Sequence, residues 1–131
     1  MAIGFEKALG VHEQALHLRV QRTEILANNL VNADTPNFKA RDIDFKSALQ
    51  GQLQTTTRVR ATHDKHIGVS DQMGFQPELK YRIPMQPSLD GNTVEEEGEI
   101  SRFAKNNMDF QTSFMFLNGK FKGLTKALKG E

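Results

Sequence analysis

Apolar residues near the C-terminus recur in an alternating three- and four-residue spacing, which is typical of a helix that packs lengthwise on another helix. Eight of the nine positions in this helix seam are apolar, and the polar member, Asn107, is of a type that can fix register. The seam comprises Ile100, Phe103, Asn107, Phe110, Phe114, Leu117, Phe121, Leu124 and Leu128. Asn92-Thr-Val-Glu95 has the spacing of a capping box and predicts the helix start. Because Gly98 weakens a helix locally, residues 92–98 are expected to form a separate turn.

A second long helix is predicted from residue 3 or 5 to about Asn32, with a length of roughly 40 Å. Its apolar residues form two adjoining stripes, and together these cover about 200° of the helix surface, twice the arc of an ordinary surface helix. The stripes hold Phe5, Leu9, Leu16, Leu26 and Leu30, and Ala8, Val11, Ala15, Leu18 and Ile25. The remaining polar face is shared by Glu6, Glu13, His17, Glu24 and Asn28. A helix with so wide an apolar arc needs more than one neighbour.

The end of this helix is marked by asparagines and a proline. Asn28, Asn29 and Asn32 crowd the last turn, and asparagine tolerates the left-handed conformation that closes helices. Pro36 cannot continue a helix and favours extended backbone at the residue before it. Residues 37–45 are therefore expected to form an extended or turning arm, anchored by Phe38, Ile43 and Phe45.

Between the two helices the chain is polar and punctuated by turn residues. Short strands are predicted at residues 57–62 and 79–83, with a small core around Val59, Ile67, Val69, Phe75, Leu79, Tyr81 and Ile83. The expected fold is mainly α: two long terminal helices packed as a coiled-coil-like stalk, with a small irregular β-containing insertion in the middle. We expect a division into residues 1–45 (helix and arm), 46–91 (insertion) and 92–131 (C-terminal helix of the stalk).

Composition narrows the possible functions. The chain has 131 residues, 37% of them hydrophobic, and a mean hydropathy of −0.54, which is low for one compact domain. A net charge of +1 provides no field that would attract nucleic acid or an anionic membrane. The absence of cysteine excludes disulfides and thiolate metal sites. No stretch of residues 1–20 resembles a secretory signal or a membrane span, so export would need a route without a cleaved signal peptide.

The candidates for chemistry are weak. His63 and His66 could bind a metal, but no cysteine or carboxylate cluster completes a ligand set, and a solvated loop is favoured. Asp42 and Asp44 lie on one face of the predicted arm, where salt bridges to Lys39, Arg41 or a neighbouring subunit are favoured over catalysis. Gly119 and Gly123 have the spacing of a close helix contact, and two tolerated glycines are an equally good explanation. No catalytic residue, cofactor or metal site is predicted.

The phenylalanine-rich stripe could be an internal core, because a two-helix hairpin would cover one seam. The wide arc of the first helix would then stay exposed, together with Met108, Met115 and Phe116. An apolar surface of that size is unusual in a monomer. Association with other chains is therefore favoured.

Residues 26–38, Leu-Ala-Asn-Asn-Leu-Val-Asn-Ala-Asp-Thr-Pro-Asn-Phe, closely resemble the N-terminal signature of the bacterial flagellar rod and hook proteins, the axial family. Residues 81–94, followed by Glu99, Phe103, Ala104 and Asn106, resemble the proximal rod members of that family. The positions carried over as an assembly motif are Leu26, Ala27, Asn28, Asn29, Leu30, Asn32, Thr35, Pro36 and Phe38. Family members commonly have Gly-Tyr where this chain has Asn37-Phe38; asparagine keeps the left-handed turn, and phenylalanine loses the hydroxyl group.

This resemblance implies a non-enzymatic structural subunit of the periplasmic rod in the flagellar basal body, exported by the flagellar type III apparatus, polymerising through its terminal helices and transmitting torque. It implies self-association and contacts with other rod proteins, the adaptor FliE, the ring protein FliF and the export gate. Two other classes stay open. One is a cytoplasmic coiled-coil regulator or export chaperone, which would form a small closed oligomer. The other is a hydrolase of the cell wall, which would need a carboxylate in a cleft.

Overall fold

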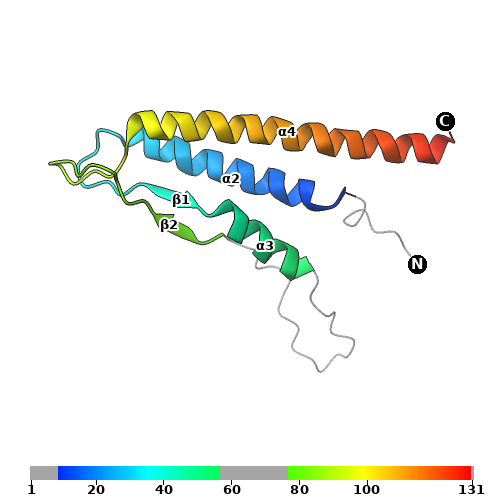
Figure 1. The fold of residues 1–131 in the computed structure, drawn as a ribbon, viewed down its shortest axis with the longest axis horizontal. Coiled ribbons are helices and arrows are strands. Elements are labelled where there is room, and N and C mark those ends of the chain that lie inside the picture. Colours follow the sequence, from blue (N-terminus) through cyan, green and yellow to red (C-terminus); the bar gives the residue numbers. More distant parts are fainter. Residues whose placement is uncertain (1–8, 57–76, 131) are drawn as a thin grey trace, which may run out of the picture.

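The protein is a helical stalk with a small side layer, described here from a computed structural model that covers residues 9–56 and 77–130. The elements follow the order α2 (Val11–Val31), β1 (Arg41–Ile43), α3 (Phe45–Thr56), β2 (Leu79–Tyr81) and α4 (Glu96–Lys129). The two long helices run antiparallel, side by side, and α3 and the two strands lie against the other side of α2 (Figure 1). The mainly helical stalk with a β-containing middle segment is as the sequence predicted. The expected helix start at residue 3 or 5 lies outside the described residues.

Helix α2 has a neighbour on each of two sides, as its wide apolar arc requires. One side packs against α4, and the other packs against β1 and α3. The second side holds a core of Leu18, Ile43 and Ala48, onto which Phe45 and Leu49 also pack. Burying a leucine or isoleucine side chain contributes roughly 1.5–3 kcal/mol. The chain therefore covers most of this arc by itself, and the expectation that the arc would stay exposed in a single chain was wrong.

The polar face of α2 is as expected within the described residues. Glu13, His17, Glu24 and Asn28 are exposed. The apolar arc on the opposite side includes Leu18 and Leu26, both almost fully buried. The hydrophobic pattern therefore predicted which side of this helix faces solvent.

The two strands form a short antiparallel pair with Arg41 opposite Tyr81 and Ile43 opposite Leu79. Strand β2 confirms the N-terminal part of the strand predicted at residues 79–83. The small core expected around it does not form at Leu79, Tyr81 and Ile83, whose side chains are exposed. The other members of that core (Val59, Ile67, Val69 and Phe75) and the predicted strand at 57–62 lie outside the described residues.

Helix α3 differs from the irregular insertion that the sequence predicts for this segment. Its start is fixed by Asp44, whose carboxylate accepts a hydrogen bond from the Ser47 N–H at 3.2 Å. Its apolar residues Phe45, Ala48 and Leu49 face the core that α2 and β1 share. An amphipathic face packed on a core stabilises a short helix whose own propensity is modest.

Helix α4 is continuous from Glu96 and includes Gly98, so the separate turn expected at 92–98 does not exist. No side chain caps its first turn, and the capping-box prediction was therefore wrong. At 1.5 Å per residue, α4 is about 51 Å long and α2 about 31 Å. Since His12 stacks on Phe116, α4 extends well beyond the first residue of α2 (Figure 1).

Candidate functional site

The end of α2 is closed by a side chain from the other end of the sequence. The Asn92 side-chain amide donates to the carbonyl oxygens of Asn32, Ala33 and Thr35 at 2.9, 2.7 and 2.9 Å. These groups belong to the last turn and the following loop, where helix carbonyls lack partners within the helix. Asn92, the residue expected to cap α4, therefore caps α2.

Left-handed backbone occurs after the helix rather than at its last turn. Asn32, the C-cap residue, has a φ of −99°, whereas Asn37 has a φ of 61°. Among the described residues, Asn37 is the one non-glycine residue with positive φ. The left-handed turn predicted at Asn37 is confirmed, and none of Asn28, Asn29 and Asn32, for which the sequence suggested the same conformation at the helix end, adopts it.

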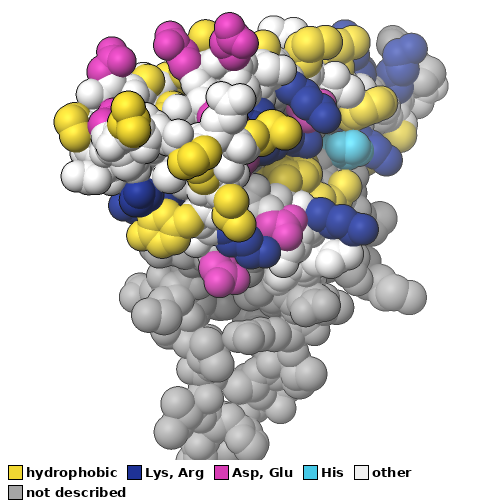
Figure 2. Space-filling view, turned by 60° about the vertical axis from the view of Figure 1, so that its left-hand side comes forward, with side chains coloured by type: hydrophobic (Ala, Val, Ile, Leu, Met, Phe, Trp, Pro, Cys, Tyr) yellow, Lys and Arg dark blue, Asp and Glu magenta, His cyan; other side chains and the backbone are white. Residues whose placement is uncertain are grey.

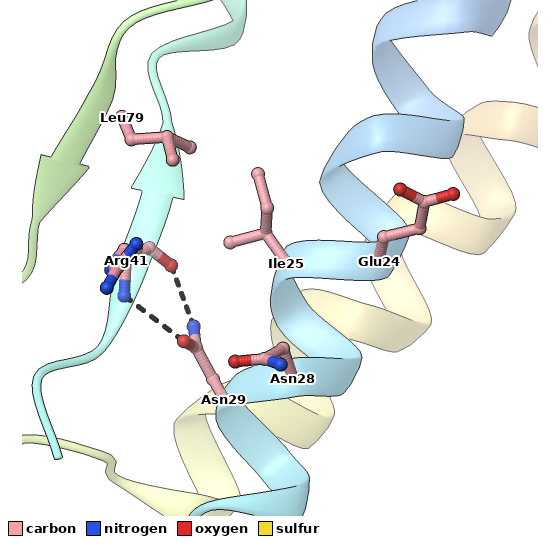
Figure 3. A pocket seen from close by; sticks show the side chains of 6 residues that line it. All are labelled: Glu24, Ile25, Asn28, Asn29, Arg41 and Leu79. Atoms are coloured by element: carbon pink, nitrogen blue, oxygen red, sulfur yellow. Dashed lines mark hydrogen bonds between the residues drawn. The ribbon is translucent and has the colours of Figure 1, made fainter.

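Asn29 joins three segments instead of ending the helix. Its side-chain amide donates to the Arg41 carbonyl at 2.7 Å, and its oxygen accepts from the Arg41 N–H at 3.1 Å (Figure 3). The amide also donates to the Glu99 carboxylate at 3.1 Å. Asn29 thus pairs with β1 as a neighbouring strand would, while it binds α4 from the opposite side. Its side chain is 1% exposed, so these bonds replace lost water contacts.

Glu99 is the most deeply buried charged residue that the described part of the chain shows, with an exposed fraction of 0%. Its carboxylate forms ion pairs with the guanidinium groups of Arg82, which follows β2, and Arg102, one turn along α4 at 3.2 Å. A buried carboxylate is tolerated only when paired and hydrogen-bonded. Glu99 therefore depends on Asn29, Arg82 and Arg102 together.

Asp42 on β1 extends this network to Arg22 on α2. Both of its oxygens accept from Arg22 on α2 at 2.9 Å, and one also contacts Arg82. Burial by itself raises the pKa of Asp42, but the hydrogen bonds and charge of Arg22, the Ile43 N–H and the charge of Arg82 outweigh it and lower that pKa. Burial lowers the pKa of Arg82, and Asp42 opposes that shift. Since arginine stays protonated throughout, Arg82 bridges two carboxylates as a cation.

A second buried polar layer lies further along the helix pair. The Asn106 amide of α4 donates to the Arg19 carbonyl at 2.9 Å and to the Thr23 hydroxyl at 2.8 Å, both on α2. The Arg19 guanidinium forms an ion pair with Asp109 at 3.0 Å and lies 3.7 Å from the centre of the Phe45 ring. This layer therefore connects α2, α4 and α3.

The two acids considered as catalytic candidates are both engaged structurally. Asp42 pairs with arginines, and Asp44 caps α3 and pairs with Lys80 at 3.2 Å. The sequence-based prediction that Lys39 or Arg41 pairs with these acids was wrong. The observed partners, Arg22, Arg82 and Lys80, come from other parts of the chain. The described residues contain no cluster of three histidines, cysteines or carboxylates suited to a metal, and His63 and His66 lie outside them.

The assembly-motif residues divide into those that hold the chain together and those that face solvent. Leu26 and Asn29 are buried, and Ala27, Leu30, Asn32 and Phe38 are half-buried. Asn28, Thr35 and Pro36 are exposed. Asn28 and Asn29 also line an open hollow of about 310 Å³ between α2 and the strands, with Glu24, Ile25, Arg41 and Leu79 (Figure 3). A role in assembly for this motif stays a prediction.

The helix seam is split between two sides of α4. Phe103, Phe110, Leu117 and Leu124 are half-buried and lie within about 60° of Asn106, at 100° per residue, on the side facing α2. Phe121 and Leu128 lie within the same arc but beyond Phe116, which stacks on the start of α2. The other members of the seam form an adjacent column with a seven-residue spacing, here named the flank column: Ile100, Asn107, Phe114, Phe121 and Leu128. Its four apolar side chains are exposed, by 42% at Phe121 and 88% at Leu128. Beside the half-buried apolar column, Glu99, Asn106 and Ser113 occupy the position on the α2-facing side of α4 that the seam had assigned to the flank column.

Sequence patterns miss most of the polar network, although Glu99 and Asn106 are part of the segment that resembles rod proteins. They stand seven residues apart beside an apolar column, and this spacing is the signal that could have identified them. Arg19, Arg22, Arg82 and Asn92 carry no such signal, because their partners are distant in sequence.

Comparisons with known proteins show which sequences this chain resembles. The family model described as "Flagella basal body rod protein" matches residues 9–39, which include α2 and its closing turn. The flagellar basal body rod protein FlgB of Aeromonas hydrophila is 48% identical over 100% of this chain and 99% of its own length. The FlgB proteins of Cereibacter sphaeroides and Escherichia coli (strain K12) are 46% and 42% identical, over 98% and 95% of this chain and 98% and 94% of their own lengths. Likeness of this degree along essentially the whole sequence shows that the chain belongs to the FlgB family of flagellar basal body rod proteins.

Proposed function

We propose that this chain is a structural, non-enzymatic subunit of the proximal flagellar rod, that it polymerises through its helices, and that it transmits torque along the rod. The family relationship supports a rod component of the basal body. The features of the structure that support polymerisation and torque transmission are the flank column and the buried polar layers.

The flank column is the observation that carries polymerisation. It spans 29 residues of α4, from Ile100 to Leu128, or about 42 Å. Apolar side chains at seven-residue spacing match the side of another helix that lies lengthwise. In the single chain, Phe114 is 55% exposed. A helix from a neighbouring subunit would cover this column, and repeated non-closing contacts of this kind build a helical array.

The buried polar layers suit a subunit that transmits torque. Apolar side chains tolerate sliding of one helix along another, whereas hydrogen-bonded pairs lose their partners when they slide. Asn29–Glu99 and Thr23–Asn106 join α2 to α4 at two positions along the stalk. Twisting one helix against the other would break both layers together, so the stalk would resist shear.

We place the chain in the periplasmic part of the basal body, after type III export without a cleaved signal peptide. Its proposed partners are other rod proteins, FliE, FliF and the export gate. In the described part of the chain, no helix combines the length and apolarity needed to cross a bilayer. A location among the axial subunits of the rod is compatible with that finding.

Phe114→Asp tests this function directly. The side chain is exposed, so the change leaves the α2–α4 contact intact, yet it buries an unpaired charge in an assembled flank contact at a cost of several kcal/mol. We expect normal expression and helicity, loss of motility, and loss of the tagged protein from isolated basal bodies. Leu117→Asp should also block assembly, with an added loss of monomer stability because Leu117 is half-buried.

Thr112→Asp is the matched control, because it adds the same charge at an exposed position of α4 about 160° around the helix from Phe114. We expect it to keep motility. Full motility of the Phe114→Asp strain at normal protein level would refute the role of the flank column. Absence of the tagged wild-type protein from isolated basal bodies would refute the rod function itself.

A further inference from the structure

Strand β2 is the outer strand of the two-stranded sheet, because β1 lies between it and α2 (Figure 1). The Arg82 N–H donates to the Ala40 carbonyl of the segment before β1 at 2.9 Å. In an antiparallel pair, successive residues direct their backbone groups alternately toward the partner strand and away from it. The register with β1 therefore turns the N–H and C=O groups of Leu79 and Tyr81 outward. No hydrogen bond to these outward groups is found among the residues that the structure describes.

The side chains of β2 alternate in chemistry. Leu79 and Tyr81 lie on one face of the sheet and are 45 and 68% exposed, and Ile83 follows at 90%. Leu79 also lines the open hollow beside α2 (Figure 3). Figure 2, in which the end of the stalk that carries the strands comes forward, shows hydrophobic side chains exposed among charged ones. An unpaired strand edge with exposed apolar side chains is a template for pairing with another chain.

We propose that the outer edge of β2 binds an extended segment of another protein as a third strand, and that this segment alternates acidic and apolar residues. In this mode of recognition, main-chain hydrogen bonds supply the affinity and alternate side chains supply the specificity. The contact is separate from the flank column, because the sheet and α4 lie on different sides of α2 (Figure 1).

The strand on the inner edge of β2 indicates the chemistry of the partner. Asp42 of β1 lies opposite Lys80, and Ile43 lies opposite Leu79. Opposite charges and apolar pairs at directly opposed positions stabilise neighbouring strands. Lys80 also pairs with Asp44, but its side chain is still 55% exposed. An acidic residue beside Lys80, with apolar residues on either side of it, would repeat this arrangement on the outer edge.

A second copy of this chain is a poor candidate for the third strand. Pairing the outer edges of two copies would set Lys80 beside Lys80 or Arg82 of the other copy, and like charges directly opposite each other destabilise a strand pair. The acidic and apolar run at residues 42–45 is held inside its own chain by ion pairs and by the core that α2 shares. The charges therefore favour a different protein as the partner.

A short fluorescent peptide that alternates isoleucine and aspartate is the probe, and fluorescence anisotropy measures its binding to the full chain. Tyr81→Pro removes an outward N–H that β1 does not use, whereas the control Tyr81→Phe keeps that group and the ring. We expect wild-type binding by Tyr81→Phe and at least roughly tenfold weaker binding by Tyr81→Pro. A peptide with lysine in place of aspartate should bind the wild type roughly tenfold more weakly, because its charges would face Lys80.

Ile83→Asp is a second variant, at a position so exposed that folding should be unaffected, and it should also weaken binding of the acidic peptide. Circular dichroism checks that each variant is folded. The proposal would be overturned by no binding of the acidic peptide, by equal binding of the acidic and basic peptides, or by wild-type affinity in both folded Tyr81→Pro and Ile83→Asp.

Isolated basal bodies provide the test in the assembled state. A photoreactive phenylalanine analogue in place of Tyr81 should form a cross-link to an extended acidic and apolar segment of another protein. Cross-links to a second copy alone, or none, would overturn the strand-docking proposal. The rod function would stand in that case, because it depends on the presence of the tagged chain in the basal bodies.

Discussion

Replacing Arg82 by methionine tests the buried polar network most directly. Arg82 is the one guanidinium among the described residues that contacts both the half-buried carboxylate of Asp42 and the buried carboxylate of Glu99. Methionine keeps much of the length and removes the charge. Asp42 would retain its two bonds from Arg22. Glu99 would retain only Asn29 and the partly exposed Arg102.

The expected loss follows from the position of Glu99. Removing one partner of a buried ion pair costs about 3–5 kcal/mol, because the other charge is left without compensation. The exposed fraction of Glu99 is 0%, so water cannot replace the lost guanidinium. A domain of this size has a total stability of about 5–15 kcal/mol, and Arg82→Met should therefore remove a large part of it.

Urea unfolding followed by circular dichroism at neutral pH measures the change. Lys80→Met is the matched control: Lys80 lies two residues before Arg82 and pairs with Asp44, but both side chains are about half exposed. Such a surface pair contributes about 0–1 kcal/mol. The double variant Arg82→Met with Glu99→Leu completes a mutant cycle, and it should be more stable than Arg82→Met because the unpaired charge is gone.

Two results would refute this reasoning. If Arg82→Met and Lys80→Met lose the same stability, the buried network does not hold the stalk together. If Glu99→Leu destabilises the Arg82→Met variant further, the cost does not arise from a stranded charge.

Three further predictions concern the motif and its surroundings. Asn29→Ala should cost about 1–3 kcal/mol of unfolding free energy, because it leaves buried backbone groups without partners; a loss below about 0.5 kcal/mol in urea unfolding would contradict the role given to this residue. Because the pKa of Asp42 is lower in the folded chain than in the unfolded one, its contribution to stability is present above about pH 4 and is lost as pH falls through the folded value. Urea midpoints between about pH 2 and pH 6 should decline below about pH 4, and Asp42→Asn should flatten that decline. Phe38→Ala should impair motility more than Pro36→Ala, since Phe38 is half-buried and Pro36 is exposed; equal defects in a swimming assay would show this order to be wrong.

Local periodicity in the sequence determined much of the fold. The three-four spacing of the C-terminal residues predicted α4, and the wide apolar arc predicted that α2 would have two neighbours. The asparagine-rich turn with Pro36 indicated the family, and the left-handed position at Asn37 followed from its replacement of glycine. Patterns of this kind can be identified from sequence because they depend on neighbouring residues and on helix geometry.

Helix α3 was missed although its pattern was present. Phe45, Ala48, Leu49 and Leu53 have helical spacing, and Asp44 is a good N-cap residue. Gly51 and the threonines at 55–57 lower the intrinsic propensity and favoured an irregular segment. Packing of its apolar face on α2 and β1 outweighed that local preference.

The tertiary structure alone decided how the helices meet. The helix seam suggested one apolar contact, yet the α2–α4 interface has Glu99 and Asn106 at its centre, and the flank column lies outside it. The partners of these residues, Asn29 and Arg19, are 70 and 87 positions away. The seven-residue spacing of Glu99 and Asn106 does not identify these partners, because hydrogen bonds and ion pairs over such separations depend on the geometry that the whole chain adopts. The sequence therefore determined which segments become helices, and only the folded chain determined which faces pair and which stay exposed for other subunits.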